Sequence, residues 1–108
     1  MNISIKLTNI EMTEAIENYV NEKLGSISKY MDEHHRENAM LRVEIGKPSE
    51  HHHSGKVFYA EGTLSFDSQV LRAEVSDDDL YAAIDSLKDK LSEQFREYKD
   101  RLVSSHHK

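Results

Sequence analysis

The sequence predicts an α+β domain in which a four-stranded sheet carries two helices on one face. Apolar residues alternate with polar ones in four short segments, as in half-buried strands, and recur every three or four residues in two longer segments, as in amphipathic helices. These segments follow one another in the order β-α-β-β-β-α. A chain of 108 residues has room for one such domain over residues 1–108, with an ordered core over about 2–102 and a tail over 103–108.

The first half of the chain predicts a β-α-β unit. Alternating apolar residues indicate a strand over 2–7, and a helix is expected to begin after Thr13, its N-cap, and to end near Asp32. The polar run 32–38 is interpreted as a connection, and alternation resumes over 41–45. Since a crossover through a helix joins parallel strands, the first two strands are expected to be parallel.

The second half predicts an antiparallel meander and a long helix. A polar, glycine-bounded loop over 46–55 precedes a strand over 57–66, and Asp67-Ser68 forms a turn into a fourth strand over 71–75. An apolar stripe then runs for six turns from Leu80 to Leu102, behind an aspartate-rich start that suits the positive end of a helix. This is the strongest element in the sequence.

If both helices cover one face of the sheet, the other face is open and polar. The alternation places there Ser4, Lys6, Arg42, Glu44, Tyr59, Thr63, Arg72 and Glu74. Tyr59 is the aromatic residue on this face that could stack on a nucleic-acid base. Tyr19, Tyr30 and Tyr81 instead belong to apolar stripes and are expected to pack in the core.

The composition excludes several classes of protein. With 0 cysteines there is no disulfide, no thiolate zinc site and no cysteine nucleophile. No apolar run approaches the about 18 residues of a membrane span, and no signal segment follows Met1, so we expect a cytoplasmic protein without a membrane partner. No glycine-rich phosphate loop or catalytic motif occurs, so we expect no enzyme, no cofactor and no small-molecule substrate.

The 7 histidines are expected to be exposed and solvated, with no metal site. His51, His52 and His53 lie in one predicted loop and His34 and His35 in another, and neighbouring loop residues rarely converge on one metal ion. Protonation of these side chains in a mildly acidic cytosol would raise the net charge from −6 and strengthen attraction to RNA.

The net charge of −6 alone argues against a nucleic-acid partner, but the charges are not evenly distributed. Residues 79–108 hold 6 acids and 6 bases. On a helical wheel, bases border both sides of the last apolar stripe: Lys88, Arg96 and Lys99 on one side, Lys90 and Arg101 on the other. The acids are expected on the solvent side: Asp85, Asp89, Glu93, Glu97 and Asp100.

Lys23 stands out because it falls inside the apolar arc of the first helix. Its stem is expected to lie between the two helices or their ends, which would bring its ammonium toward the groove that the last helix borders. The alternative explanation of all these charges is ordinary solvation, with acids and bases paired three or four residues apart along each helix.

These residues resemble the ribosome hibernation-promoting factor and ribosome-associated inhibitor A family. The resemblance is carried in the last helix by Asp79-Leu80-Tyr81-Ala82-Ala83-Ile84-Asp85, Leu87, Asp89-Lys90-Leu91 and Lys99-Asp100-Arg101, and in the first by Thr13-Glu14-Ala15-Ile16, Tyr19-Val20, Lys23 and Tyr30. It covers about residues 2–102, as in the short form of the family, which lacks a C-terminal dimerisation domain.

The resemblance implies a double-stranded-RNA-binding-like fold that binds the small ribosomal subunit and its ribosomal RNA, in the channel for messenger and transfer RNA. Translation would be inhibited under stress or in stationary phase. Because nothing in the sequence demands a larger assembly, we expect a monomer off the ribosome. The RNA-binding positions that match the family are Lys23, Lys90, Lys99 and Arg101, and local geometry adds Lys29, Lys88 and Arg96.

The sequence departs from the family at Ser26, Glu93 and Glu97, where relatives commonly carry bases. Two other functions therefore stay open. One is a protein-interaction module of the same fold that has lost ribosome binding. The other is a general RNA-binding domain that does not recognise assembled ribosomes.

Overall fold

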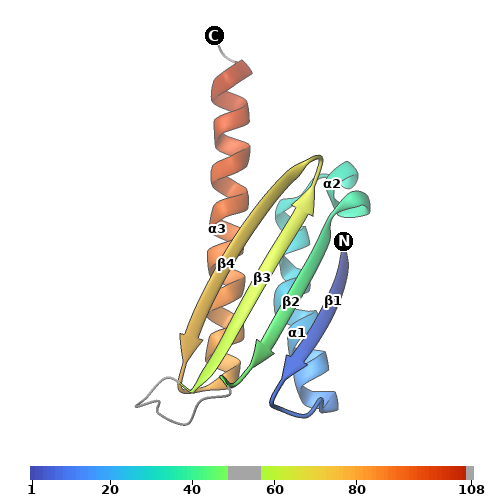
Figure 1. Ribbon diagram of the computed structural model, residues 1–108. Helices are drawn as coiled ribbons and strands as arrows, with labels where there is room; N and C mark the ends of the chain where they lie inside the picture. Colours follow the sequence, from blue (N-terminus) through green and yellow to red (C-terminus); the bar gives the residue numbers. More distant parts are fainter. Residues whose placement is uncertain (49–56, 107–108) are drawn as a thin grey trace.

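The computed structural model describes residues 1–48 and 57–106 and has the predicted α+β architecture (Figure 1). Its elements, in chain order, are β1 (Asn2–Thr8), α1 (Glu14–Gly25), the 3-10 helix η1 (Ser26–Tyr30), α2 (Glu33–Asn38), β2 (Met40–Gly46), β3 (Phe58–Phe66), β4 (Gln69–Asp77) and α3 (Leu80–His106). The predicted order of strands and long helices is confirmed, with η1 and α2 added between α1 and β2.

The four strands form one sheet in the order β1-β2-β3-β4. As predicted, β1 is parallel to β2, and the other two pairs are antiparallel. Asp67 and Ser68 form the turn between β3 and β4, with φ of 46° and 66°, the left-handed conformation that suits a two-residue hairpin. Most of the predicted loop over 46–55 lies outside the described residues.

The helices α1 and α3 lie side by side behind the sheet in Figure 1, and the opposite face is open. Between the two layers lies a core whose largest fully buried side chains include Phe95, Leu24, Ile27 and Leu41. Phe95 also meets Phe66 edge-on, with the ring centroids 5.2 Å apart. Burial of each such side chain contributes about 1.5–3 kcal/mol to folding.

The first helix differs from its prediction. The N-cap is confirmed, since the Thr13 hydroxyl accepts from the Ile16 amide at 3.1 Å. The α-helix, however, ends at Gly25 instead of near Asp32, and η1 takes over. The hydroxyl of Ser26 donates to the Lys23 carbonyl at 2.5 Å, and that of Ser28 to the Gly25 carbonyl at 2.7 Å. These short local bonds favour the tighter 3-10 turn.

The predicted polar connection after this helix is wrong, because Glu33–Asn38 forms the short helix α2. The Asp32 carboxylate caps it by accepting from the His35 amide at 2.8 Å. None of the residues in α2 is buried, so the helix has no apolar stripe by which the sequence could reveal it.

The long helix α3 begins where Asp79 caps it, its carboxylate accepting from the Ala82 amide at 2.9 Å. Its core side chains run from Ala83 to Phe95. The helix then continues beyond the sheet (Figure 1), and Leu102 and Val103 are 40% and 56% exposed there. Along the part of the chain that is described, no helix has both the length and the apolar character that crossing a membrane requires.

Candidate nucleic-acid interface

A hollow of about 230 Å³ lies between α1 and α3, and two lysines line it. Lys23 reaches it from α1, and Lys88, Asp85 and Asp89 reach it from α3. The ammonium of Lys23 lies 5.5 Å from the centroid of the Tyr19 ring, over its face. The expectation that Lys23 extends into the groove bordered by the last helix is therefore confirmed.

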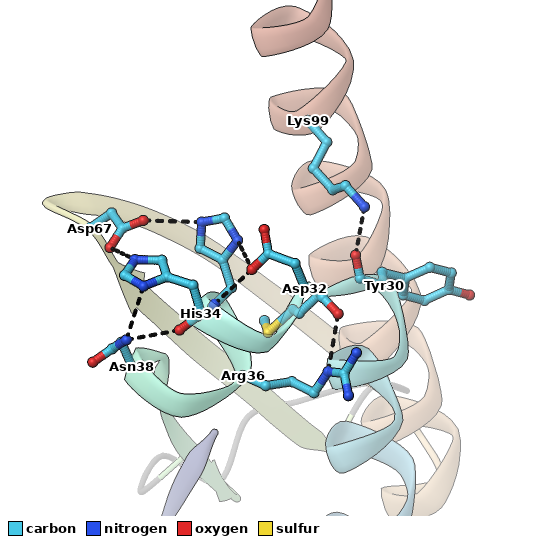
Figure 2. Close-up of polar contacts among 9 residues, drawn as sticks. Tyr30, Asp32, His34, Arg36, Asn38, Asp67 and Lys99 are labelled. Carbon is cyan, nitrogen blue, oxygen red and sulfur yellow. Dashed lines mark hydrogen bonds and ion pairs between the residues drawn. The ribbon is translucent and has the colours of Figure 1, made fainter.

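Further along α3, two more cations gather around Tyr30 of η1. The Lys99 ammonium donates to the Tyr30 carbonyl at 2.8 Å (Figure 2). The Arg96 guanidinium lies 5.1 Å from the centroid of the Tyr30 ring. Lys29, the residue before Tyr30, is exposed on the same 3-10 helix. Aromatic faces and a backbone carbonyl thus hold these cations in place.

Four cations therefore lie at the junction of α1 and η1 with α3, and exposed Lys29 adjoins them on η1. We call this set the basic seam: Lys23, Lys29, Lys88, Arg96 and Lys99. Within the described part of the chain, Lys88 is the member that forms an ion pair, with Asp89 at 3.3 Å. Phosphate binding favours clustered cations that are free of carboxylates, and the other four members of the basic seam have no ion-pair partner among the described residues.

Lys90 and Arg101 lie on the other border of α3. This border of α3 faces β4, because the side-chain amide of Gln94 donates to the Arg72 carbonyl of β4 at 2.8 Å. Lys90 and Arg101 are four residues before and seven after Gln94, which is the same face of the helix. Both are exposed. The structure therefore divides the predicted RNA-binding residues between the two sides of α3.

The predicted position of Asp85 on the solvent side of α3 is wrong. Its carboxylate accepts from the Tyr19 hydroxyl at 2.7 Å and is half-buried against α1. This hydrogen bond, the largest cause, raises the pKa of Tyr19 to about 12. The prediction failed because a helical wheel of α3 does not include the tyrosine hydroxyl that the facing helix α1 brings to Asp85. The other acids assigned to the solvent side, Asp89, Glu93, Glu97 and Asp100, are exposed as expected.

The open face of the sheet carries charges of both signs. The strand register places Glu44 opposite Glu61, and Glu61 opposite Glu74, so three carboxylates form a row across β2, β3 and β4. Arg42 and Arg72 flank Thr63 in the neighbouring row. Burial, followed by repulsion from Glu74 and Glu44, raises the pKa of Glu61. This face is therefore a poor surface for phosphates.

Tyr59 lies on the open face as predicted, but its hydroxyl is engaged. It donates to the Glu44 carboxylate at 2.6 Å, and Thr8 donates to the same oxygen at 3.1 Å. The bond from Tyr59 is the largest cause that lowers the pKa of Glu44. The aromatic residues of the basic seam, Tyr19 and Tyr30, instead contact cations.

Comparison with known proteins agrees with this fold. Residues 3–103 match the family described as Sigma 54 modulation protein / S30EA ribosomal protein. The chain belongs to this family. It is 33% identical over 99 residues to a ribosome hibernation promotion factor of Lactococcus lactis subsp. cremoris and 36% identical over 94 residues to one of Staphylococcus aureus. These alignments cover 92% and 87% of the chain, but only 50% and 46% of the two relatives, so the chain spans about half their length.

Two solved structures show the same fold. The crystal structure of the N-terminal domain of Protein Y from Thermus thermophilus aligns with a TM-score of 0.72 and 32% identity, covering 91% of this chain and 99% of that one. A ribosomal subunit interface protein from Coxiella burnetii aligns with a TM-score of 0.74 at 19% identity, covering 93% and 99% of the two chains. The S30EA domain of this chain thus corresponds to nearly the whole of each of these two structures.

The S30EA domain also holds a histidine cluster that corrects a prediction. His35 is not solvated: its side chain is 12% exposed, and its ring nitrogens lie 3.0 Å from Asp32 and 3.1 Å from Asp67. His34 lies 2.8 Å from Asp67, and this hydrogen bond is the largest cause that raises the pKa of His34 (Figure 2). Among the described residues, no three histidine or acidic side chains are grouped to hold a metal ion. His51, His52 and His53 lie outside those residues.

We call these four side chains the histidine clasp: Asp32, His34, His35 and Asp67. The clasp joins α2 to the turn between β3 and β4. The clasp therefore fixes the segment that follows η1, and with it one end of the basic seam.

Sequence reasoning found the cations of the interface but missed Tyr19 and Asp85 as polar members of it. Tyr19 was assigned to the core, against which its ring does pack, and its hydroxyl contact was not foreseen; Asp85 was assigned to solvent. One signal was available, since Tyr19 precedes Lys23 by four residues and so shares a helix face with it. The partner of Tyr19 lies 66 residues away in the sequence, and only the packing of α1 on α3 reveals it.

Proposed function

We propose that this protein binds the small ribosomal subunit through the basic seam and suppresses translation as a ribosome hibernation factor. The seam would contact ribosomal RNA in the channel for messenger and transfer RNA, and occupancy of that channel would block translation under stress or in stationary phase. Membership of the S30EA family and similarity to two ribosome hibernation promotion factors support this proposal. The role is one of binding, without catalysis, in the cytoplasm.

The observation that carries the proposal is the basic seam itself. Three helical elements, α1, η1 and α3, contribute cations to one surface in a chain whose net charge is −6. Tyrosine rings and a backbone carbonyl support Lys23, Arg96 and Lys99, so these side chains are positioned without being neutralised. A ligand with regularly spaced phosphates matches such a surface.

Lys90 and Arg101 extend the proposed contact to the second border of α3. The end of α3 extends beyond the sheet, so an RNA groove could receive the helix with cations on both sides (Figure 1). Exposed Glu93 and Glu97 lie on the same helix and reduce the positive surface. They would discourage binding to bulk RNA, and fit to the assembled subunit would then provide part of the selectivity.

Cosedimentation tests the proposal. The purified chain is run on gradients with small subunits, large subunits and intact ribosomes, at low and at high salt. We expect it to travel with small subunits and intact ribosomes at low salt and to be released at high salt, because phosphate contacts weaken steeply with salt. Protein that stays at the top of every gradient would contradict the proposal.

A second candidate function is a protein-interaction module that has lost ribosome binding. The row of Glu44, Glu61 and Glu74 and the exposed Glu93 and Glu97 favour it, because they offer acidic surfaces to a basic partner. Reversal of Lys23, Lys90, Lys99 and Arg101 to Glu separates the candidates. If the unmodified chain binds ribosomes and the folded variant does not, the result supports the ribosome hibernation factor. If the reversal has no effect, the result supports the protein-interaction module. Equal binding to free RNA and to subunits would indicate a general RNA-binding domain.

We further propose that the chain is a monomer off the ribosome. The helical layer buries its core side chains up to Phe95 against its own sheet, and the open sheet face is charged. Sedimentation equilibrium of the free chain at several concentrations measures this directly. A mass of about 12.5 kDa at all concentrations is expected, and a mass that doubles with concentration would contradict it.

A further inference from the structure

Tyr19 makes two different contacts at the basic seam, one with its ring and one with its hydroxyl. The ring face lies under the ammonium of Lys23, at 5.5 Å from its centroid. The hydroxyl donates to the Asp85 carboxylate at 2.7 Å. The ring is itself held by Tyr81, which meets it edge-on with the centroids 4.8 Å apart. Tyr19 therefore stands between a cation and an anion that line the same hollow.

Lys23 and Asp85 would otherwise be natural partners. Both line the hollow of about 230 Å³ between α1 and α3, and they carry opposite charges. Yet no carboxylate among the described residues lies within ion-pair distance of the Lys23 ammonium. The Asp85 carboxylate is bound to a neutral hydroxyl instead. Lys88, the other cation of the hollow, is the one that pairs with a carboxylate, that of Asp89 at 3.3 Å.

The chemical consequence concerns phosphate. An ammonium has three N–H donors, and one held over an aromatic face keeps them available to a ligand. An ammonium paired with a carboxylate must break that pair before it can bind a phosphate oxygen. Charge-assisted hydrogen bonds between ammonium and phosphate are among the strongest in recognition, so the state of Lys23 in the free protein matters.

We propose that Tyr19 is a positioning residue that keeps Lys23 available for an RNA phosphate by engaging Asp85. The proposal rests on the proposed function, in which the basic seam binds ribosomal RNA. Tyr19 need not touch the RNA. Its hydroxyl holds the carboxylate of Asp85, its ring holds the ammonium of Lys23, and the two charges stay apart until a phosphate arrives.

The experiment compares four variants for binding to purified small ribosomal subunits: the unmodified chain, Tyr19→Phe, Asp85→Asn and the double variant. Tyr19→Phe keeps the ring under Lys23 and against Tyr81 but loses the hydroxyl, so Asp85 is released to pair with Lys23. We expect affinity to fall about two- to fivefold, the equivalent of breaking one partly exposed ion pair. Asp85→Asn leaves an acceptor for Tyr19 without a charge and should bind at least as tightly as the unmodified chain.

The double variant separates positioning from packing. If Tyr19 acts by holding Asp85, removal of the charge of Asp85 rescues Tyr19→Phe, and the double variant binds like Asp85→Asn alone. If the double variant binds as weakly as Tyr19→Phe, the hydroxyl serves the packing of α1 on α3 and the proposal is wrong. Thermal unfolding of each variant measures any loss of fold separately.

A second measurement uses the free protein, so that it does not depend on ribosome binding. Acetylation of each lysine by acetic anhydride is followed by mass spectrometry. In Tyr19→Phe the new ion pair should slow the acetylation of Lys23 severalfold, while Lys29 reacts as before. An unchanged rate at Lys23 overturns the proposal. If small subunits do not bind the unmodified chain while the acetylation of Lys23 still slows in Tyr19→Phe, the proposed function is wrong. In that case the role of Tyr19 in keeping Lys23 unpaired is still supported.

Discussion

The two faces of this molecule both carry cations but organise them in opposite ways. On the open sheet face, Arg42 and Arg72 lie beside the row of Glu44, Glu61 and Glu74, so each positive charge is offset nearby. In the basic seam, Lys23 and Lys99 contact a tyrosine ring and a backbone carbonyl and no carboxylate among the described residues. The comparison teaches that net charge is a poor guide to whether a protein binds nucleic acid. The groups that lie beside each cation, carboxylates on one face and aromatic rings or carbonyls on the other, decide which surface can bind phosphate.

The largest expected effect on stability comes from the hydrophobic core between the sheet and the helices. Phe95→Ala removes a fully buried ring that packs on Phe66 and should cost about 3–5 kcal/mol of stability. Thr63→Ala, on the open face, should cost less than about 1 kcal/mol. Denaturant unfolding of both variants measures the difference. Equal losses would mean that the open face is as important to folding as the core.

The next prediction sets the two charged surfaces against each other in binding. Lys23→Glu combined with Lys99→Glu should weaken binding to small subunits by at least about 100-fold, since hydrogen bonds to charged groups are each worth about 1.5–3 kcal/mol. The matched control is Arg42→Glu combined with Arg72→Glu, which changes the net charge by the same amount on the open sheet face. Filter binding at fixed salt compares them, and equal losses in both variants would reduce the effect to net charge.

A smaller effect concerns the histidine clasp, which supports one end of the seam. Asp67→Asn removes the partner of His34 and His35 and should lower Tm by roughly a few degrees near pH 5.5. The pKa of His34 is raised in the folded protein. The stabilisation of the fold by protonated His34 is therefore complete below the ordinary histidine pKa of about 6.5, and it is lost as the pH rises through the raised pKa. The difference in Tm should therefore shrink toward pH 9.

The control for the clasp is Asp78→Asn, an exposed aspartate that lies before α3. Its effect on Tm should be small and independent of pH between about 5.5 and 9, because no histidine contact is removed. If Asp67→Asn and Asp78→Asn behave alike across this range, the clasp does not stabilise the fold.

The smallest effect is expected in the glutamate row of the sheet. Glu61→Gln removes the central one of three facing carboxylates and should stabilise the fold at pH 7 by about 0.2–1 kcal/mol, the cost of like charges placed opposite one another. Since the pKa of Glu61 is raised, the folded state binds its proton more readily, and the advantage of Gln should fade as pH falls through that raised value. Glu11→Gln, in an exposed loop, is the control, and urea unfolding at pH 7 and at pH 4 makes the comparison.

The fold could be predicted from the sequence because apolar residues recur with the spacing of strands or of helices wherever an element has a buried face. Ile3 and Leu41 alternate with polar neighbours, and α3 keeps its stripe from Leu80 to beyond Phe95. Prediction failed where structure depends on local hydrogen bonds instead of burial. The end of α1 at Gly25 follows from the serine hydroxyls of η1, and α2 follows from the cap at Asp32, and neither feature leaves an apolar pattern.

The candidate interface was predictable in part for a related reason. Helical spacing alone placed Lys23 in the groove and divided the bases of α3 between two borders. It could not pair Asp85 with Tyr19 or His35 with Asp67, because each bond joins elements that the sequence does not place relative to one another. The sequence predicts the face of a helix on which a side chain lies, but it does not predict the polar partner that another element brings to that face.

The most direct test of the central account is a lysine footprint of the unmodified chain, because lysines lie on both faces. The protein is acetylated alone and with a saturating amount of small ribosomal subunits, and each site is quantified by mass spectrometry. We predict strong protection of Lys23, Lys29, Lys88 and Lys99 in the seam, and none of Lys6 on the open face of β1. Protection of Lys6 with full reactivity at the seam would contradict the account and make the sheet the surface that meets the ribosome.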